Sequence, residues 1–145
     1  MKAIAIIPAR YALTRLPGKP LLDQTGMTLI EHVVQAVSTA RGVQDVVVAT
    51  DDARIASAVE AFGGACVMTR ADHVSGTDRL AEAAEILGLD GDDIVVNVQG
   101  DEPEMPGACV DQLVGLLAET NCPMATLATP LGYEEAGDPN KVKVV

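Results

Sequence analysis

The residues best suited to chemistry lie in one loop near the start of the chain. Arg10, Arg15 and Lys19 are spaced at intervals of five and four residues, in a segment that two prolines stiffen. Guanidinium groups bind pairs of phosphate oxygens and a lysine ammonium acts as a point charge, so three cations from one loop suit a triphosphate. The alternative is a basic loop that is only solvated.

Asp101 stands in a second loop of interest. It follows the apolar run Asp93–Val98, inside the segment NVQGDEP. In an open parallel sheet, ligands bind outside the carboxyl ends of the strands, so this carboxylate is placed to face a ligand and to hold Mg²⁺ through one oxygen. Glu102 is a second candidate for that role. The structural alternative is an aspartate that caps the turn after a strand.

A third loop, TRADHVSGTDR, offers hydrogen-bond donors. Ser75, Gly76 and Thr77 precede an expected helix, where free amides and hydroxyls point outward. Such donors suit the edge of a base or a ribose hydroxyl. The same residues serve equally well as a plain helix cap.

Other polar residues are interpreted as structural. Asp51 and Asp52 follow an expected strand and are interpreted as the N-cap pair of the next helix. His32 and His73 are not spaced with other ligand residues for a transition metal. We therefore expect no catalytic role for either histidine.

The charge of the chain is acidic overall but unevenly placed. The chain has 10 Lys+Arg and 21 Asp+Glu, a net charge of −11, while residues 1–20 contain four bases and no acid. Nucleic acids and anionic membranes repel an acidic protein, so we expect neither as a partner. A basic pocket at the N-terminal end still suits a small anion.

Two common nucleotide motifs, a membrane span and a signal-peptide pattern are missing from the sequence. No G-x-G-x-x-G follows the first apolar run and no G-x-x-x-x-G-K-[ST] occurs, which disfavours dinucleotide-dependent oxidoreductases and P-loop NTPases. No apolar run reaches the ~18–20 residues of a membrane span, and there is no signal-peptide pattern. We therefore expect a cytoplasmic protein with another nucleotide chemistry.

The elements that position these loops alternate between short apolar runs and amphipathic helical patterns. The predicted strands are Ala3–Ile7, Val46–Thr50, Ala65–Met68, Asp93–Val98, Met124–Ala128 and Val142–Val145. Helical spacing of apolar residues predicts a helix after each of the first four strands, and the helix after the third strand begins near Thr77, beyond a loop. The alternation predicts an α/β fold, a Rossmann-like three-layer sandwich with a mostly parallel sheet, as a single domain over residues 1–145.

The end of the sequence is unusual for such a domain. The last predicted strand runs to Val145 with no turn, cap or polar tail after it. A natural terminus usually lies in a surface segment. We therefore expect the domain to be truncated at its C-terminal end.

Five segments together match a known pattern: IPARYALTRLPGKPL, ATDD, TRADHVSGTDRLAE, VVNVQGDEP and DPNKVKVV, in this order and spacing. From about Ala3 to Val145 the chain resembles the 3-deoxy-manno-octulosonate cytidylyltransferases, or CMP-Kdo synthetases. The pairing of SGTDRLAE with VNVQGDEP is the specific part of this resemblance. It implies a nucleotide-diphospho-sugar transferase type of fold and a reaction in which CTP and Kdo give CMP-Kdo and pyrophosphate, for lipopolysaccharide biosynthesis.

The resemblance also implies a cofactor, an assembly and residue roles. The cofactor would be Mg²⁺, with Asp101 as its ligand, and a full-length protein would form a homodimer. Arg15, Lys19 and Asp101 would be catalytic. The nucleotide-binding residues would be Ala9, Arg10, Arg15, Lys19, Arg70, Ser75, Gly76, Thr77 and Gln99.

Two other functions stay open at this level. One is a related sugar nucleotidyltransferase, such as a CMP-sialate synthetase. The other is a CTP-binding fragment without turnover, because family members are longer and their C-terminal part supplies a second metal-binding aspartate and much of the sugar pocket.

Overall fold

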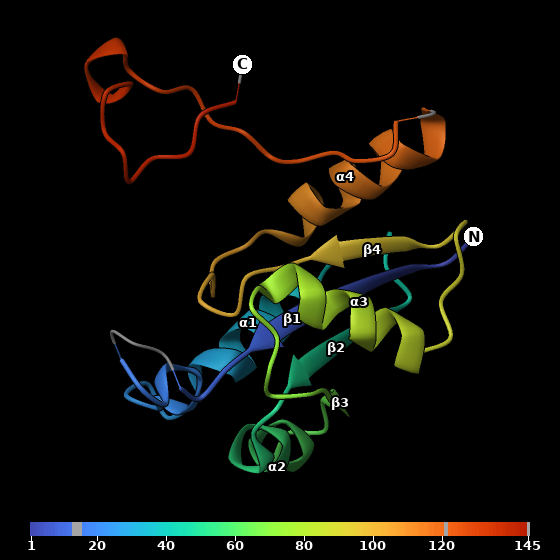
Figure 1. Ribbon diagram of the computed structural model, residues 1–145, viewed down its shortest axis with the longest axis vertical. Helices are drawn as coiled ribbons and strands as arrows, with labels where there is room; N and C mark the ends of the chain where they lie inside the picture. Colours follow the sequence, from blue (N-terminus) through green and yellow to red (C-terminus); the bar gives the residue numbers. More distant parts are fainter. Residues whose placement is uncertain (13–15, 121, 145) are drawn as a thin grey trace.

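The computed structural model describes residues 1–12, 16–120 and 122–144, whose core is a parallel sheet between helices (Figure 1). Within these residues the spatial strand order is β3-β2-β1-β4. The strands are β1 (Ala3–Ala9), β2 (Asp45–Thr50), β3 (Ala65–Met68) and β4 (Ile94–Asn97). Each of the three strand pairs is parallel, which confirms the predicted sheet.

In the described part of the chain, four α-helices follow the predicted patterns and cover the sheet. They are α1 (Leu29–Val37), α2 (Ala53–Ala61), α3 (Gly76–Ile86) and α4 (Gly107–Glu119). The side chains of Thr28, Asp52 and Ser75 each accept a backbone N–H in the first turn of α1, α2 and α3. These caps satisfy amides that a helix start leaves without partners, so they fix where each helix begins.

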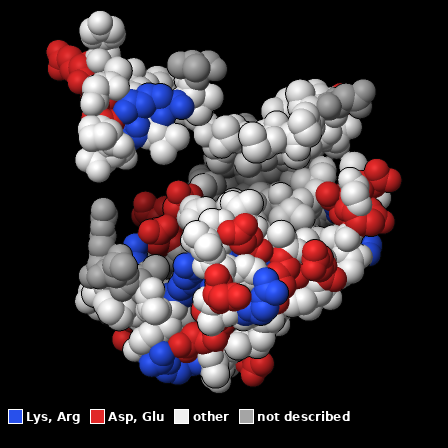
Figure 2. Space-filling view, viewed as in Figure 1, with Lys and Arg blue, Asp and Glu red and all other residues white. Residues whose placement is uncertain are grey.

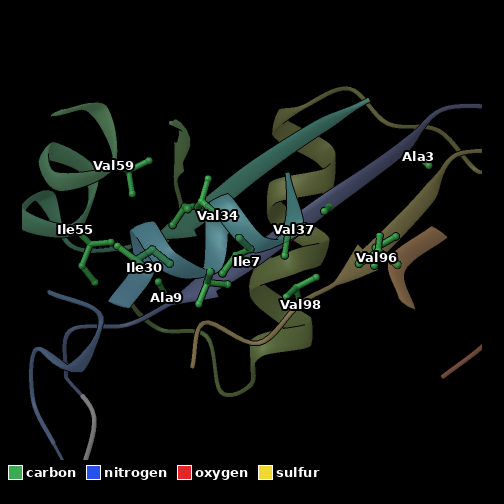
Figure 3. Packing of buried hydrophobic residues seen from close by; sticks show 14 of the residues in the cluster. Ala3, Ile7, Ala9, Ile30, Val34, Val37, Ile55, Val59, Val96 and Val98 are labelled. Atoms are coloured by element: carbon green, nitrogen blue, oxygen red, sulfur yellow. The ribbon is translucent and has the colours of Figure 1, made fainter. Parts of the chain in front are cut away.

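Side chains alternate along each strand and build two apolar clusters, one on each face of the sheet. The larger cluster joins the sheet to α1, α2 and α4 and includes Ile7, Ile30 and Val59 (Figure 3). The smaller one joins Ile6 to Leu80 of α3 on the opposite face. Helices on both faces make the three-layer sandwich that the sequence predicts.

Two predicted strands do not form. Met124–Ala128 and the described residues 142–144 of Val142–Val145 have no strand structure. After α4 the chain turns back along this helix, where residues 124–127 line a groove with β4, and only then extends away from the sheet, through the short 3-10 helix Tyr133–Glu135 (Figure 1). A strand needs a neighbouring strand for its backbone hydrogen bonds, and neither segment pairs with the sheet within the described residues. Both strand predictions are therefore wrong.

The charged side chains are distributed unevenly over the surface. Acidic and basic groups are mixed on the face that α3 covers, whereas the region of α4 is mostly uncharged (Figure 2). No helix in the described part of the chain is both long enough and apolar enough to cross a membrane.

Candidate functional site: a basic cleft at the carboxyl ends of β1 and β4

The loop after β1, which carries Arg10 and Lys19, is closed by a short-range contact. The Gly18 amide donates to the Tyr11 carbonyl at 2.8 Å. Gly18 has a φ of 71°, and a Cβ there would lie 3.1 Å from the Tyr11 ring, so this turn requires glycine. The guanidinium of Arg54 lies 3.3 Å from the centroid of the Tyr11 ring, which anchors the loop to α2.

Parallel pairing of β1 with β4 brings this loop to Asp101. Ile6 pairs with Asn97, so the chain leaves both strands at the same edge of the sheet. Lys19 Nζ lies 2.9 Å from Asp101 Oδ2. The two side chains are 35% and 55% exposed, so a ligand can reach both partners of the ion pair.

A cleft of about 220 Å³ opens at this edge. Its lining includes these residues predicted from the sequence: Ala9, Arg10, Lys19, Gly76, Gln99 and Asp101. Gly100 brings the two loops into close contact, because a Cβ at this position would lie 3.0 Å from the carbonyl oxygen of Pro8. The cleft therefore joins cations, a carboxylate and the start of α3 in one place.

The other predicted site residues lie elsewhere or have partners within the protein. Arg70 lines a neighbouring hollow of about 550 Å³. The Ser75 hydroxyl accepts from the Asp78 amide, and both the hydroxyl and the amide of Ser75 donate to the Asp78 carboxylate, which lowers the pKa of Asp78. Thr77 lines an apolar groove beside β4. Arg15 lies outside the described residues.

The magnesium prediction for Asp101 is compatible with the donor set. Mg²⁺ keeps several waters and is often held by one or two carboxylates together with substrate phosphates. No cluster of three or more His, Cys, Asp or Glu side chains that could hold a metal occurs among the described residues. Glu102 lines the apolar groove rather than the cleft. An exposed carboxylate in a basic cleft therefore suits a metal that arrives with a nucleotide.

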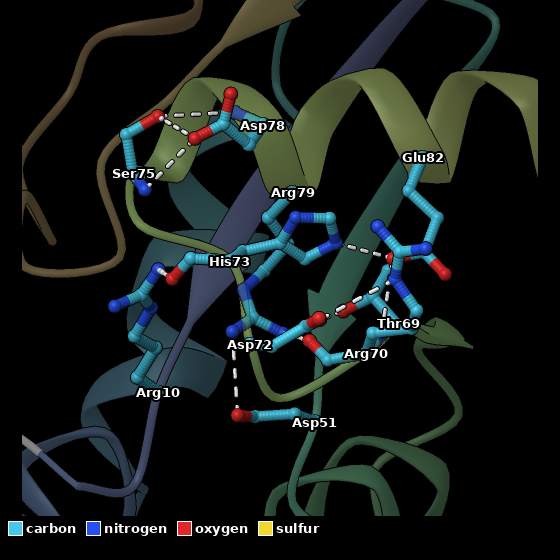
Figure 4. A network of polar contacts seen from close by, with 10 residues as sticks. All are labelled: Arg10, Asp51, Thr69, Arg70, Asp72, His73, Ser75, Asp78, Arg79 and Glu82. Atoms are coloured by element: carbon cyan, nitrogen blue, oxygen red, sulfur yellow. Dashed lines mark hydrogen bonds and ion pairs between the residues drawn. The ribbon is translucent and has the colours of Figure 1, made fainter.

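Arg79 is a buried charge that the sequence patterns did not indicate. It is fully buried, and its Nη1 donates to Thr69 Oγ1 at 2.5 Å (Figure 4). Its Nη2 lies 3.3 Å from Asp51 Oδ2, so Asp51 balances this charge. Asp52 alone caps α2, and the predicted N-cap pair is therefore wrong for Asp51. The Nε and Nη2 of Arg79 have no hydrogen-bond partner among the described atoms. Such a cation depends on its carboxylate partner, because an unpaired buried charge is strongly destabilising.

His73 and Glu82 form a second unexpected pair. His73 Nε2 bonds to Glu82 Oε2 across the loop before α3 (Figure 4). This bond is the main cause of a lowered pKa for Glu82. The sequence offers a signal only for the helix side of these contacts: Arg79 and Glu82 are three residues apart, so they lie on one face of α3.

A parallel α/β sheet with a basic cleft at the carboxyl ends of β1 and β4 places the chain in the class of open α/β proteins that bind ligands at this end of the sheet. The family model described as "Cytidylyltransferase" matches residues 4–145. The chain belongs to this cytidylyltransferase family.

Curated relatives make the family assignment more specific. The 3-deoxy-manno-octulosonate cytidylyltransferases of Syntrophobacter fumaroxidans and Yersinia pseudotuberculosis are each 54% identical to the chain, over 147 and 146 residues. The matches cover 100% of this chain but only 59% and 58% of the relatives. The chain therefore spans about three fifths of their length. These matches confirm the resemblance seen in the sequence.

Solved structures share the fold. A structure of CMP:2-keto-3-deoxy-manno-octonic acid synthetase complexed with CTP matches with a TM-score of 0.78 and 47% identity, over 83% of this chain and 49% of that chain. A cytidylyltransferase from Leptospira borgpetersenii matches with a TM-score of 0.70 and 26% identity, over 82% of this chain and 50% of that chain.

Proposed function

We propose that the chain is the CTP-binding part of a cytidylyltransferase that converts CTP and Kdo to CMP-Kdo and pyrophosphate. The observation that carries the proposal is the meeting of Arg10, Lys19 and Asp101 in one cleft. These groups match the needs of a metal-bound triphosphate, and the cleft opens where parallel sheets bind ligands. Membership of the family and identity to Kdo cytidylyltransferases support the choice of nucleotide and sugar.

The cations have a direct role in the proposed reaction. The anomeric hydroxyl of Kdo releases its proton to solvent and its oxygen bonds to the α-phosphorus of CTP, while the bond from the α-phosphorus to the leaving pyrophosphate breaks. Catalysis of phosphoryl transfer is mostly positioning and charge stabilisation. Arg10 and Lys19, with Arg15 as the third predicted cation, bind the triphosphate and balance the charge that develops on pyrophosphate. Mg²⁺ held by Asp101 and phosphate oxygens would supply further charge neutralisation when bound.

We expect the cytidine end of the nucleotide to bind at the start of α3. Gly76 lies in the cleft, at the first turn of the helix, where backbone amides are free to donate. Gln99 lies in the same cleft and offers an amide to the nucleotide or the sugar. Arg70, Ser75 and Thr77 stay predictions from the family resemblance.

The proposal also covers the cellular setting. A Kdo cytidylyltransferase would act in the cytoplasm, in lipopolysaccharide biosynthesis, and as a homodimer in a longer protein. Support comes from the 54% identity to curated Kdo cytidylyltransferases. The net charge of −11 favours small anionic substrates in a local basic cleft over nucleic acid.

Pyrophosphate release tests the proposal. CTP binding by the chain is measured first, with UTP as the matched control nucleotide, and release is then measured with CTP, Kdo and Mg²⁺. Binding of CTP with release supports the full proposal, while binding without release supports a bare CTP-binding module. Release with another 2-keto sugar acid but not with Kdo supports a CMP-sialate type of enzyme. Failure to bind CTP overturns the proposal.

A further inference from the structure

The loop between β3 and α3 is held by side chains of α3. Residues 70–74 lie outside any helix or strand, so no regular backbone ladder holds them. At the start of the loop, Arg79 Nη1 donates to the Thr69 hydroxyl at 2.5 Å and to the Arg70 carbonyl at 3.3 Å. At the end of the loop, Ser75 caps the helix. Between these two contacts, the loop is held by the side chain of Glu82.

Glu82 contacts the loop twice through one carboxylate oxygen. Its Oε2 accepts from the Arg70 amide at 3.0 Å and bonds to His73 Nε2 (Figure 4). The His73 side chain is only 6% exposed and that of Glu82 is 22% exposed. Polar groups at this depth need partners, because an unsatisfied buried group costs free energy. Glu82 therefore fixes the path of the loop from Arg70 to His73.

The same loop is joined to the cleft by Arg10. Arg10 Nη2 donates to the backbone carbonyl of His73, so this cation is bonded to the residue that Glu82 holds (Figure 4). The contact joins positions 63 residues apart and connects the loop after β1 to the loop before α3. Placement of the Arg10 guanidinium in the cleft thus depends on where Glu82 holds His73.

We propose that Glu82 is a positioning residue of the nucleotide site, which sets the Arg10 guanidinium for the triphosphate through His73. This inference rests on the proposed function, because it assigns the triphosphate to Arg10. Glu82 itself lines the neighbouring hollow and is not among the residues of the cleft. Its effect on binding must therefore pass through the loop.

A double-mutant cycle with CTP as the probe tests this coupling. Glu82→Ala lowers CTP affinity at least fivefold in the wild-type background, but less than twofold in an Arg10→Ala background, since contacting residues couple non-additively. Arg10→Lys replaces Arg10→Ala in the cycle if the alanine variant binds too weakly to titrate. Glu82→Gln, which keeps an oxygen acceptor for the Arg70 amide, recovers most of the affinity.

Glu85→Ala is the matched control. Glu85 lies one turn further along α3, lines the same hollow and is exposed, so its removal changes the local charge equally without releasing His73. This variant keeps wild-type affinity for CTP, and thermal melts verify that each variant is folded. The inference is overturned, and the proposed function is left standing, by either of two results. One is an equal loss of CTP affinity from Glu82→Ala in both backgrounds, and the other is an equal loss from Glu82→Ala and Glu85→Ala. A wild-type chain that does not bind CTP overturns the proposed function together with it.

Discussion

Lys19 Nζ and Asp101 Oδ2 lie 2.9 Å apart, across the two loops that frame the cleft. The lysine ammonium binds the carboxylate to which a bound nucleotide would bring Mg²⁺. An exposed ion pair of this kind contributes little to stability, with a typical value of about 0–1 kcal/mol. Moving the Lys19 ammonium from Asp101 to a phosphate group therefore costs little free energy.

Asp101→Asn should remove the Mg²⁺ dependence of CTP binding. The wild-type chain is expected to bind CTP roughly tenfold more tightly with Mg²⁺ than without it, a difference of about 1.4 kcal/mol in binding free energy. In Asp101→Asn this ratio falls to about one, because an amide is a much weaker ligand for the metal than a carboxylate. Calorimetric titration with and without Mg²⁺ measures the ratio. Glu102→Gln is the control, and an unchanged ratio in Asp101→Asn contradicts the metal assignment.

Lys19→Ala should weaken CTP binding more than CMP binding. A lysine that contacts the β- or γ-phosphate adds a charge-assisted hydrogen bond, typically worth about 1.5–3 kcal/mol, that CMP cannot form. The expected loss is therefore roughly tenfold or more for CTP and slight for CMP. Competition binding with both nucleotides measures the two losses. Equal losses of affinity for CTP and CMP would contradict the assignment of Lys19 to the β- or γ-phosphate.

Gly107→Ala should destabilise the fold by overpacking. A Cβ at Gly107 would lie 2.4 Å from Thr39 Oγ1 and 2.5 Å from the Ala40 backbone nitrogen, where α4 meets the end of α1. Overpacking of this kind typically costs about 1–3 kcal/mol. Urea unfolding measures the loss. The matched control is Gly115→Ala in the same helix, where a Cβ meets nothing within 4 Å and alanine is the better helix former, so that variant is as stable as the wild type or more stable.

Asp52 should contribute to acid sensitivity. Its hydrogen bond with the Arg54 side chain is the main cause that lowers the pKa of Asp52 from 3.8 to about 2. A carboxylate with a lowered pKa in the folded state stabilises the protein above its unfolded pKa, and this contribution is lost as the pH falls from 3.8 through 2.

Melting temperatures of the wild type and Asp52→Asn between pH 6 and pH 2 test this contribution. Asparagine still caps a helix but does not titrate, so it isolates the effect of charge. The wild type is expected to be the more stable of the two near pH 6, with the difference shrinking toward pH 2. A difference that stays constant over this range would contradict the role of the Asp52 charge.

The sheet and most of the cleft could be predicted because they depend on local patterns and on one general rule. Apolar runs such as Ala3–Ile7 have the periodicity of buried parallel strands, and the loops that follow such strands meet at one edge. That rule brings Arg10, Lys19 and Asp101 to the same end of the sheet.

The features that the sequence did not reveal depend on distant partners. Met124–Ala128 has the composition of a strand, but a strand forms only where another strand accepts its hydrogen bonds. Arg79 is of a residue type that rarely enters a protein interior without a partner, so nothing in the local sequence marks it as buried. Its partner Asp51 follows a different strand, and this pairing appears only in three dimensions.

The long separation between the two halves of the cleft affects the order of events in folding. Lys19 and Asp101 are 82 residues apart and meet only after β1 has paired with β4. Closing a loop of this length is entropically costly, so such non-local pairing is slow. We therefore expect nucleotide binding to appear late in refolding. Since CTP would bind only the finished sheet, added nucleotide should slow unfolding and leave the rate of refolding nearly unchanged.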